Sequence, residues 1–266
     1  NQAPGGTVTF GSTAPPSAAA GKAVFVGTDN EDAPTLGGIY LAPLVNKPAL
    51  RTLAEIGGSV PGMSGQKFTN FGEGLSFDGR LVGFWGAWGT ATRTVNLTCP
   101  TDGNPDLLAV CKDKTVRVPL NQGIFVHDLS TGSTKLIART GAAYRDFLFW
   151  VFSGRPPGTG DDEGTLEPAR WRSSAFVAVQ LNGTAPATAF KALQPNDVQG
   201  IFLRPRPTAK VRTVLASGSD ARKLDPEAPA GSLVTALGIE RDGFRGCKLA
   251  LNASMLNAAT DRKSVV

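Results

Sequence analysis

Apolar residues in this chain come in short runs separated by glycine, proline and other turn formers. The run FLFWVF at 147–152 has the length of one strand, and a sustained helical period is missing almost everywhere. The chain carries 32 Gly and 19 Pro, so it is rich in turns, and Val, Ile, Thr and Phe fill the stretches between them. With 41% apolar residues it can bury a sizeable core. The pattern predicts an all-β fold.

One segment type occurs three times. Gly38-Ile39-Tyr40, Gly123-Ile124-Phe125 and Gly200-Ile201-Phe202 each begin an apolar run, and 12 or 13 residues after each glycine a basic residue opens a second run. Those basic residues are Arg51, Lys135 and Arg212. Turn formers lie between the two runs of each pair. We therefore expect three antiparallel hairpins.

Dense apolar strands precede these hairpins at 21–29, 79–88 and 172–182, and 243–252 is a fourth copy. Four strands in a repeat of this length are the signature of a β-propeller blade. We expect a single β-propeller domain over 1–266, made of four-stranded antiparallel blades. Its units fall at about 1–60, 61–141, 142–225 and 226–266, the last one incomplete. A β-solenoid would show a shorter period, and a sandwich would not repeat itself.

The fourth unit ends early, with KSVV in place of its Gly-Ile-Phe strand. Either the amino terminus supplies the missing strand and removes the open sheet edge, or the chain is part of a larger propeller. The opening NQAPGG resembles a linker between units, which favours the larger propeller.

The segment LSFDGRLVGFW at 75–85 resembles the signature of TolB-type, WD-like propeller repeats. Ser76, Asp78, Gly79 and Arg80 match that signature, and Phe77 stands where it usually has Pro. The Asp-Gly pair suits a tight turn with positive φ before a buried strand. The hairpins also look like repeats of secreted bacterial proteins of unassigned function. The resemblance implies the propeller architecture and no particular reaction.

Charge excludes some partners. The net charge of +5 comes from scattered Lys and Arg residues without a basic run, so we expect no nucleic-acid partner. No apolar stretch approaches the roughly 20 residues of a transmembrane helix, and we expect no transmembrane segment.

Cysteines and sequons point to an oxidising compartment. Cys99 and Cys111 flank an insertion present only in the second unit and are expected to form a disulfide, although two reduced thiols remain the alternative. Cys247 is expected to be a buried free thiol. N-glycosylation sequons start at Asn96, Asn182 and Asn252, and we expect the last two to end equivalent strands before exposed turns. An extracellular or cell-surface protein is the resulting expectation.

Candidate chemistry is sparse. The single histidine, His127, occupies a position held by Ala42 and Arg204 in the other units, which indicates a surface position without a catalytic role. No catalytic residue or metal site is assigned and no cofactor is expected. The acidic loops at 29–32 and 161–164 offer the oxygen ligands that Ca²⁺ prefers, but without the spacing of a known calcium loop.

Two further patterns concern binding. Lys22, Arg80, Arg172 and Arg245 each precede the buried strand of a unit; if that strand is innermost, they would ring one mouth of the channel and attract an anionic ligand such as an acidic sugar. Charged strand ends in water are the simpler alternative. Four tryptophans fall in the second and third units, where packing between units explains them more often than a sugar-stacking platform does: Trp85, Trp88, Trp150 and Trp171.

We therefore expect a non-enzymatic extracellular module that binds a protein or glycan partner. A polysaccharide lyase or glycosidase with its site at the channel mouth is one alternative. A structural building block of a self-assembling surface layer or filament is another.

Overall fold

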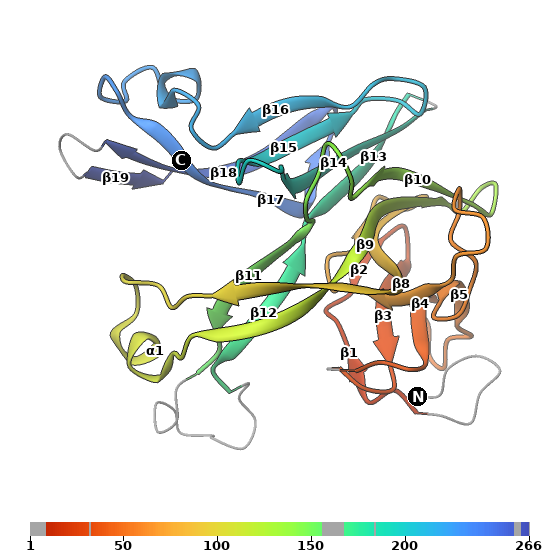
Figure 1. Ribbon diagram of the computed structural model, residues 1–266. Coiled ribbons are helices and arrows are strands. Elements are labelled where there is room, and N and C mark those ends of the chain that lie inside the picture. The colour runs from red at the N-terminus through yellow and green to blue at the C-terminus, as the bar shows by residue number, and fades with distance from the viewer. Residues whose placement is uncertain (1–8, 32, 156–167, 184, 258–261, 266) are drawn as a thin grey trace.

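Four antiparallel sheets follow one another along the chain in the computed structural model (Figure 1). The structure describes residues 9–31, 33–155, 168–183 and 185–257 and the backbone of 262–265. The strands of each sheet are consecutive in sequence. A separate two-stranded hairpin lies between the second and third sheets in the chain. The all-β prediction is confirmed.

The first two sheets have five strands each, in the same order. The first contains β1 (Ser12–Thr13), β2 (Ser17–Ala19), β3 (Lys22–Thr28), β4 (Gly37–Pro43) and β5 (Arg51–Glu55). The second contains β6 (Phe68–Phe71), β7 (Ser76–Phe77), β8 (Leu81–Leu97), β9 (Lys114–Asp128) and β10 (Ser133–Arg139). In each sheet, two short strands share the free edge of the next strand.

The other sheets are simpler. The inserted hairpin consists of β11 (Leu148–Ser153) and β12 (Arg170–Ala175). The third sheet contains β13 (Val177–Asn182), β14 (Ala185–Leu193), β15 (Gln199–Arg204) and β16 (Arg212–Ala216). The fourth contains β17 (Leu233–Arg245), β18 (Lys248–Asn257) and β19 (Arg262–Val265). The described helices are α1 (Pro105–Val110) and the 3₁₀ turn η1 (Ala221–Lys223), and neither could cross a membrane.

The three expected hairpins are confirmed, as β4–β5, β9–β10 and β15–β16. Each has a bulge at the same place, where Leu53, Ile137 or Val214 is skipped in the pairing. The repeated sequence therefore encodes a repeated bulge. Each bulge bends its strand and increases the twist of that strand.

The glycine that opens each hairpin is needed for space. A Cβ on Gly38 would lie 2.1 Å from the carbonyl oxygen of Ala54 on β5. At Gly123 it would meet the Leu136 side chain at 2.8 Å, and at Gly200 the ring of Phe202 at 2.7 Å. Close approach of the outer strand at Gly38 and Gly123, and of the Phe202 ring at Gly200, thus explains why the motif starts with glycine.

One strand assignment was wrong. The segment 172–182 was expected to correspond to 21–29 and 79–88, yet β3 and β8 lie second in their sheets whereas β13 is the first strand of the third sheet. The register places β14, beside the Gly-Ile-Phe strand, in the position of β3 and β8. Small apolar residues fill both β13 and β14, so composition did not distinguish them.

Strand β19 pairs with β18 and takes the place expected for the KSVV segment. The first described strands, β1 and β2, pair with β3 of their own sheet. Residues 1–8 lie outside the described residues, so their closing of the fourth sheet stays a prediction.

Strands β2, β7, β13 and β17 meet through two buried serines at equivalent register positions. Ser17 Oγ accepts a hydrogen bond from the Phe77 N–H (3.1 Å), and Ser76 Oγ accepts one from the Val179 N–H (3.0 Å). Each hydroxyl thus joins its sheet to the next one. The equivalent residue in β13 is Ala178, which has no hydroxyl.

Both hydroxyls donate to a single bulge in β17. Ser17 Oγ donates to Asp242 Oδ1 at 3.0 Å and Ser76 Oγ to the Arg241 carbonyl at 2.5 Å. The bulge lies between Ile239 and Phe244, where the pairing with β18 is interrupted. The fourth sheet therefore contacts the first two directly.

Three apolar clusters fill the spaces between successive sheets. The cluster between the first and second sheets includes Val24, Ile39, Phe84 and Phe125. The next includes Trp85, Ile124, Val177 and Phe190, and the last includes Ala189, Ile201, Leu237 and Phe244. Each sheet is consequently packed on its sequence neighbours.

His127 is buried, contrary to the surface position that its repeat equivalents suggested. Only 5% of it is exposed, and its Nδ1 lies 2.8 Å from the Thr134 hydroxyl. The equivalent Ala42 is buried as well, so alanine at this position marks a small space and not a solvated surface. Burial, together with the positive charge of Arg51, lowers the pKa of His127 below its ordinary 6.5, although Asp128 opposes this.

Replacing the opening glycines should cost unequal amounts of stability. Gly38→Ala forces a Cβ against backbone, whereas Gly200→Ala meets a ring that can rotate, so we expect the first to lose roughly 3 kcal/mol or more and the second about 1. Urea unfolding of both variants measures this. Equal losses, or a larger loss for Gly200→Ala, would contradict the steric account.

The buried imidazole should make stability depend on pH. Since the folded pKa of His127 is depressed, the unfolded chain binds its proton first, and the free energy of unfolding should fall as pH drops below about 6.5. His127→Ala, which introduces the residue found at the equivalent position 42, should flatten this dependence between pH 7.5 and 5.5. Parallel curves for the two proteins would show that another group is responsible.

Candidate functional site

Two elements depart from the repeat, and both project from the same side of the molecule (Figure 1). The first is the outer half of the β8–β9 hairpin, which pairs Thr92–Leu97 with Lys114–Pro119 and has no counterpart in the shorter β3–β4 pair. The second is the β11–β12 hairpin. Both extend beyond the repeated sheets, and we call the first one the arm.

A disulfide closes the tip of the arm, as expected from the sequence. Cys99 and Cys111 are bonded, with Cα atoms 6.0 Å apart, and enclose α1. Asn104 caps this helix by accepting from the Asp106 N–H at 2.9 Å. A bond closing a loop of this size stabilises by about 3 kcal/mol in the chain-entropy model. The arm tip is thus ordered without a core of its own.

Polar contacts brace the arm against the β11–β12 hairpin. Arg93 of the arm forms an ion pair with Asp146, whose side chain is only 4% exposed. The other oxygen of Asp146 accepts from the N–H groups of Phe147 and Leu148, at 2.8 and 3.0 Å, where β11 begins. The Trp171 indole N–H donates to the Lys112 carbonyl at 2.9 Å.

The β11–β12 hairpin is also fixed to the third sheet. Lys191 of β14 is 7% exposed, and its Nζ lies 3.8 Å from the ring centre of Phe149 and 5.2 Å from that of Phe176. Burial lowers the pKa of Lys191 to about 8. Cation–π contacts of this kind favour the charged form of the lysine and hold β11 in place.

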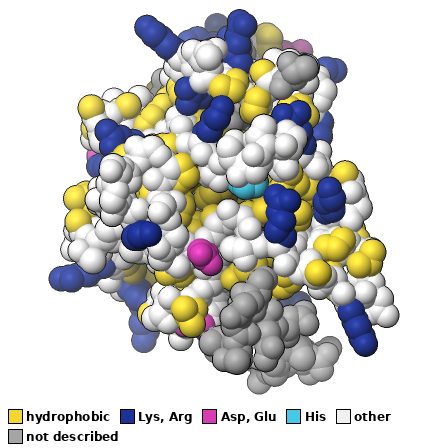
Figure 2. Space-filling model, turned by 90° about the vertical axis from the view of Figure 1, so that its right-hand side faces the viewer, with side chains coloured by type: hydrophobic (Ala, Val, Ile, Leu, Met, Phe, Trp, Pro, Cys, Tyr) yellow, Lys and Arg dark blue, Asp and Glu magenta, His cyan; other side chains and the backbone are white. Residues whose placement is uncertain are grey.

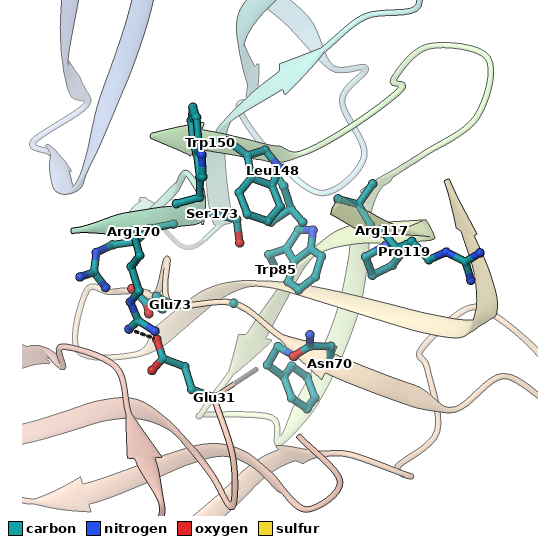
Figure 3. A pocket seen from close by; sticks show the side chains of 15 residues that line it. Glu31, Asn70, Glu73, Trp85, Arg117, Pro119, Leu148, Trp150, Arg170 and Ser173 are labelled. Atoms are coloured by element: carbon teal, nitrogen blue, oxygen red, sulfur yellow. Dashed lines mark hydrogen bonds and ion pairs between the residues drawn. The ribbon is translucent and has the colours of Figure 1, made fainter. Parts of the chain in front are cut away.

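A cleft of about 260 Å³ lies between the arm, the β11–β12 hairpin and the edge of the second sheet (Figure 3). A loop of the first sheet contributes Glu31. The other lining residues are Asn70, Phe71, Gly72, Glu73, Trp85, Arg117, Val118, Pro119, Leu148, Trp150, Arg170, Trp171, Arg172 and Ser173. Three tryptophans and three arginines in one concave site are a composition suited to binding.

Trp85 forms a fixed part of the cleft wall. Its indole N–H donates to Gln122 Oε1 at 3.1 Å, and the Gln122 amide donates to the Pro119 carbonyl at 2.7 Å. Gln122 is fully buried. A Cβ on Gly72 would lie 3.0 Å from the Trp85 ring, so the backbone passes directly over this side chain. Trp85 is therefore held in one orientation before any ligand arrives.

The β11–β12 hairpin has an aromatic face of its own. Trp150 pairs with Ser173, and Phe152 with Trp171, and residues directly opposite in an antiparallel pair share a face. Alternation then places Leu148 on the same face. The buried Nε1 of Trp150 has no hydrogen-bond partner among the described residues. A buried donor of this kind favours a ligand or water as its acceptor.

The cleft carries charges of both signs. Arg170 and Glu31 form an ion pair across it, which Figure 3 shows as a dashed line. Arg172 donates to the Pro168 carbonyl at 3.2 Å. Arg117 is exposed on the arm, at the opposite wall from Arg170. Arginine exceeds glutamate among the lining residues, which favours anionic or polyhydroxylated ligands.

Metal ligands are not gathered in the described part of the chain, where no group of three or more His, Cys, Asp or Glu could hold an ion. Asp29 accepts from the Thr35 and Leu36 N–H groups, both at 3.0 Å, and from the Thr35 hydroxyl at 2.6 Å, and these bonds lower its pKa to about 2. Glu31 pairs with Arg170. Asp32 and 161–164 lie outside the described residues.

The residues expected to ring a channel mouth occupy two kinds of position. Lys22, Arg80 and Arg245 lie at the turns that join β2, β7 or β17 to the neighbouring strand, whereas Arg172 lies in β12 and lines the cleft. Strands β3 and β8, which follow Lys22 and Arg80, are second in their sheets and not innermost. A shared ligand for the four residues stays a prediction.

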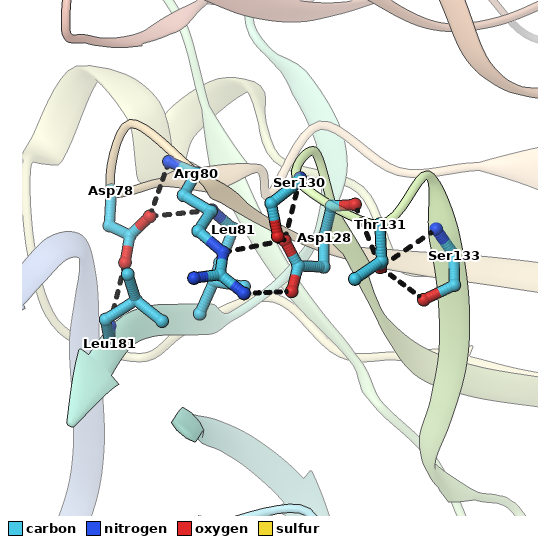
Figure 4. A network of polar contacts seen from close by, with 8 residues as sticks. All are labelled: Asp78, Arg80, Leu81, Asp128, Ser130, Thr131, Ser133 and Leu181. Carbon is cyan, nitrogen blue, oxygen red and sulfur yellow. Dashed lines mark hydrogen bonds and ion pairs between the residues drawn. The ribbon is translucent and has the colours of Figure 1, made fainter. Parts of the chain in front are cut away.

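Arg80 is tied into a polar network (Figure 4). Its Nε and one terminal nitrogen donate to the two Asp128 oxygens at 2.8 and 2.7 Å, which raises the Arg80 pKa and lowers that of Asp128. Asp78 accepts from the Arg80 and Leu81 N–H groups and, through its second oxygen, from the Leu181 N–H at 2.8 Å. Arg245 donates to the Phe77 carbonyl at 3.3 Å. Both arginines thus hold the turn regions together.

Cys247 is a free thiol, as expected, but the expected burial was wrong. This thiol is exposed, because Gly246 and Cys247 form the two-residue turn between β17 and β18, with φ of 55° and 63°. A turn that needs positive φ at both central residues lies at a sheet end and cannot fill a core.

The sequon asparagines are all exposed, but in different settings. Asn96 lies on the arm, where its side chain accepts from the Thr115 hydroxyl at 3.3 Å. Asn182 ends β13 before a turn, as expected. Asn252 does not end a strand, since β18 continues to Asn257. The two therefore do not occupy equivalent positions.

The sequence singles out the four tryptophans but does not reveal the other residues that line the cleft. Trp88 is 3% exposed and packs on Phe125, as expected for packing between sheets, whereas Trp150 and Trp171 line the cleft. Glu31, Asn70 and Arg117 come from three separate segments. The available signal was the insertion itself, because both segments that interrupt the repeat carry exposed Trp or Arg residues.

Comparisons with known proteins identify no relatives in sequence. No family model matches the chain, and no curated protein matches it. Among solved structures, oligogalacturonate lyase in complex with manganese is similar over 92% of this chain and 73% of its own length, at 14% sequence identity and a TM-score of 0.13. A TM-score of this size carries no argument about fold or function.

Proposed function

We propose that the four sheets are blades of a β-propeller, with β2, β7, β13 and β17 as the innermost strands. The repeated hairpins with their common bulge support this, as do the apolar clusters between successive sheets. The units then fall at about 1–60, 61–141, 142–225 and 226–266. The Asp78-Gly79 turn, with φ of 105° at Gly79, is consistent with the resemblance to TolB-type repeats.

We further propose that the protein is a non-enzymatic module that binds a glycan in the tryptophan-lined cleft. The observation that carries this proposal is that the two non-repeated elements meet to form the cleft and supply all of its Trp and Arg side chains except Trp85. A repeat that only had to build a scaffold would not need either element. Flat indole rings pack on the apolar faces of pyranose rings, and arginine donates to hydroxyl and carboxylate oxygens.

The ligand is best matched by a glycan that contains uronic acid. Arg117 forms no ion pair with any described residue, and it lies on the wall opposite the Arg170–Glu31 pair. A carboxylate on one sugar would pair with Arg117 while a neighbouring ring packs on Trp150. This arrangement needs a segment of at least two sugars.

We place the protein at the cell surface or outside the cell. The Cys99–Cys111 disulfide and the exposed sequon asparagines support an oxidising, secretory compartment. Two alternatives stay open: a polysaccharide lyase or glycosidase with its site at the propeller channel mouth, and a structural block of a surface assembly.

Binding to a hyaluronan hexasaccharide, with neutral chitohexaose as the comparison, tests the proposal by isothermal titration calorimetry. Trp150→Ala should weaken binding of both about tenfold or more through the lost stacking. Arg117→Ala should weaken only the acidic sugar, about fivefold for one charge-assisted contact. Arg212→Ala on β16, away from the cleft, serves as the matched arginine control.

Chromatography of the sugars after incubation distinguishes the alternatives. Unchanged hexasaccharides fit a binding module, whereas shortened or unsaturated products would make the protein an enzyme. If neither sugar binds, or if Trp150→Ala binds both as the wild type does, the cleft is not the glycan site.

A further inference from the structure

A second concave site lies between the second and third sheets, outside the cleft. It is a groove of about 190 Å³ between β10 on one side and β14 and β15 on the other. Leu136, Ile137, Pro186 and Pro207 give it apolar walls. Lys135 and Arg204 also line it. The groove therefore combines apolar surface with two cations.

Arg204 is held in place and forms no ion pair with a described residue. Its two terminal nitrogens donate to the carbonyls of Ile137 at 3.3 Å and Pro207 at 2.5 Å. Its Nε is buried and has no hydrogen-bond partner among the described residues. Both contacts use neutral acceptors, so no described carboxylate neutralises this partly buried guanidinium charge. A partly buried cation of this kind favours a bound anion.

The carboxylate at the groove is already engaged. Asp128 lines the groove, but it binds Arg80 through both oxygens and also accepts from the Ser130 hydroxyl at 2.8 Å (Figure 4). Lys135 is exposed and forms no ion pair with a described residue. The face that shows the single histidine in Figure 2 also carries more Lys and Arg than Asp and Glu side chains. The groove thus keeps a net positive charge.

The repeat shows that this charge is not required by the fold. Arg204 is equivalent to Ala42 in the first sheet and His127 in the second, each four residues after the opening glycine. The same position accommodates a methyl group and an imidazole between other strands. An arginine here is therefore a local feature of this one groove.

We propose that this groove binds a small organic carboxylate with an apolar tail. The carboxylate pairs with Arg204 and Lys135, and the tail packs on Leu136, Ile137 and the two prolines. Thr131, Ser133 and Thr188 also line the groove. The site is independent of the glycan proposal, since the two sites share no lining residue.

Titration of ¹⁵N-labelled protein with hexanoate, followed by NMR, tests this site. We expect saturable shifts of the Ile137, Thr188 and Arg204 amides. Hexan-1-ol has the same tail without the charge and should bind at least about tenfold more weakly. Equal binding of the two, or no saturable shift at these amides with hexanoate, would overturn the proposal.

Two variants and one matched control identify the cations. Lys135→Ala removes an exposed side chain, and Arg212→Ala removes the repeat-equivalent cation of the third sheet, which does not line the groove. Hexanoate affinity should fall about fivefold or more in the first and stay unchanged in the second. Arg204→Ala introduces the residue natural at position 42 and should abolish saturable binding, with far-UV circular dichroism checking the fold. Wild-type affinity in Lys135→Ala and Arg204→Ala would show that the groove does not recognise the anion.

Discussion

The hydroxyl of a buried serine, shared between neighbouring inner strands, is the interaction on which the arrangement of the sheets depends. A backbone N–H at an inner strand cannot pair within its own sheet on the free edge, and leaving it buried without a partner costs about 1–3 kcal/mol. Ser17 and Ser76 each accept such a donor from the next sheet and donate their own proton to the β17 bulge. Two short side chains therefore connect all four inner strands.

These contacts among β2, β7, β13 and β17 explain why the sheets differ from one another mainly in their outer parts. The hairpins β4–β5, β9–β10 and β15–β16 keep the same glycine and the same bulge, because neighbouring atoms leave no space for a side chain at the glycine. The arm and the β11–β12 hairpin add length without disturbing that register. They are held by the Asp146 ion pair, by the contact between Lys191 and Phe149, and by the disulfide. The cleft is thus an addition to a regular scaffold.

Features that are local or repeated could be predicted from the sequence. Gly-Ile-aromatic spacing sufficed for the hairpins, and an insertion flanked by Cys99 and Cys111 sufficed for the disulfide. Features that depend on which strand lies beside which are not accessible from the sequence: β13 resembles β3 and β8 in composition but lies at another place in its sheet, and the burial of His127 is not visible from its repeat equivalents. Cys247 was misplaced because an apolar flank outweighed the Gly-Cys turn. The cleft combines Glu31, Arg117 and Trp150 from separate segments, which no single motif records.

Native-state hydrogen exchange at two amides tests the central claim most directly. If serine hydroxyls join the inner strands, Ser17→Ala should speed exchange of the Phe77 amide about tenfold or more and leave Val179 protected. Ser76→Ala should do the reverse. Unchanged protection of both amides in both variants would contradict the account, as would equal acceleration of both amides by either substitution, because the sheets would then be joined by something other than these two hydroxyls.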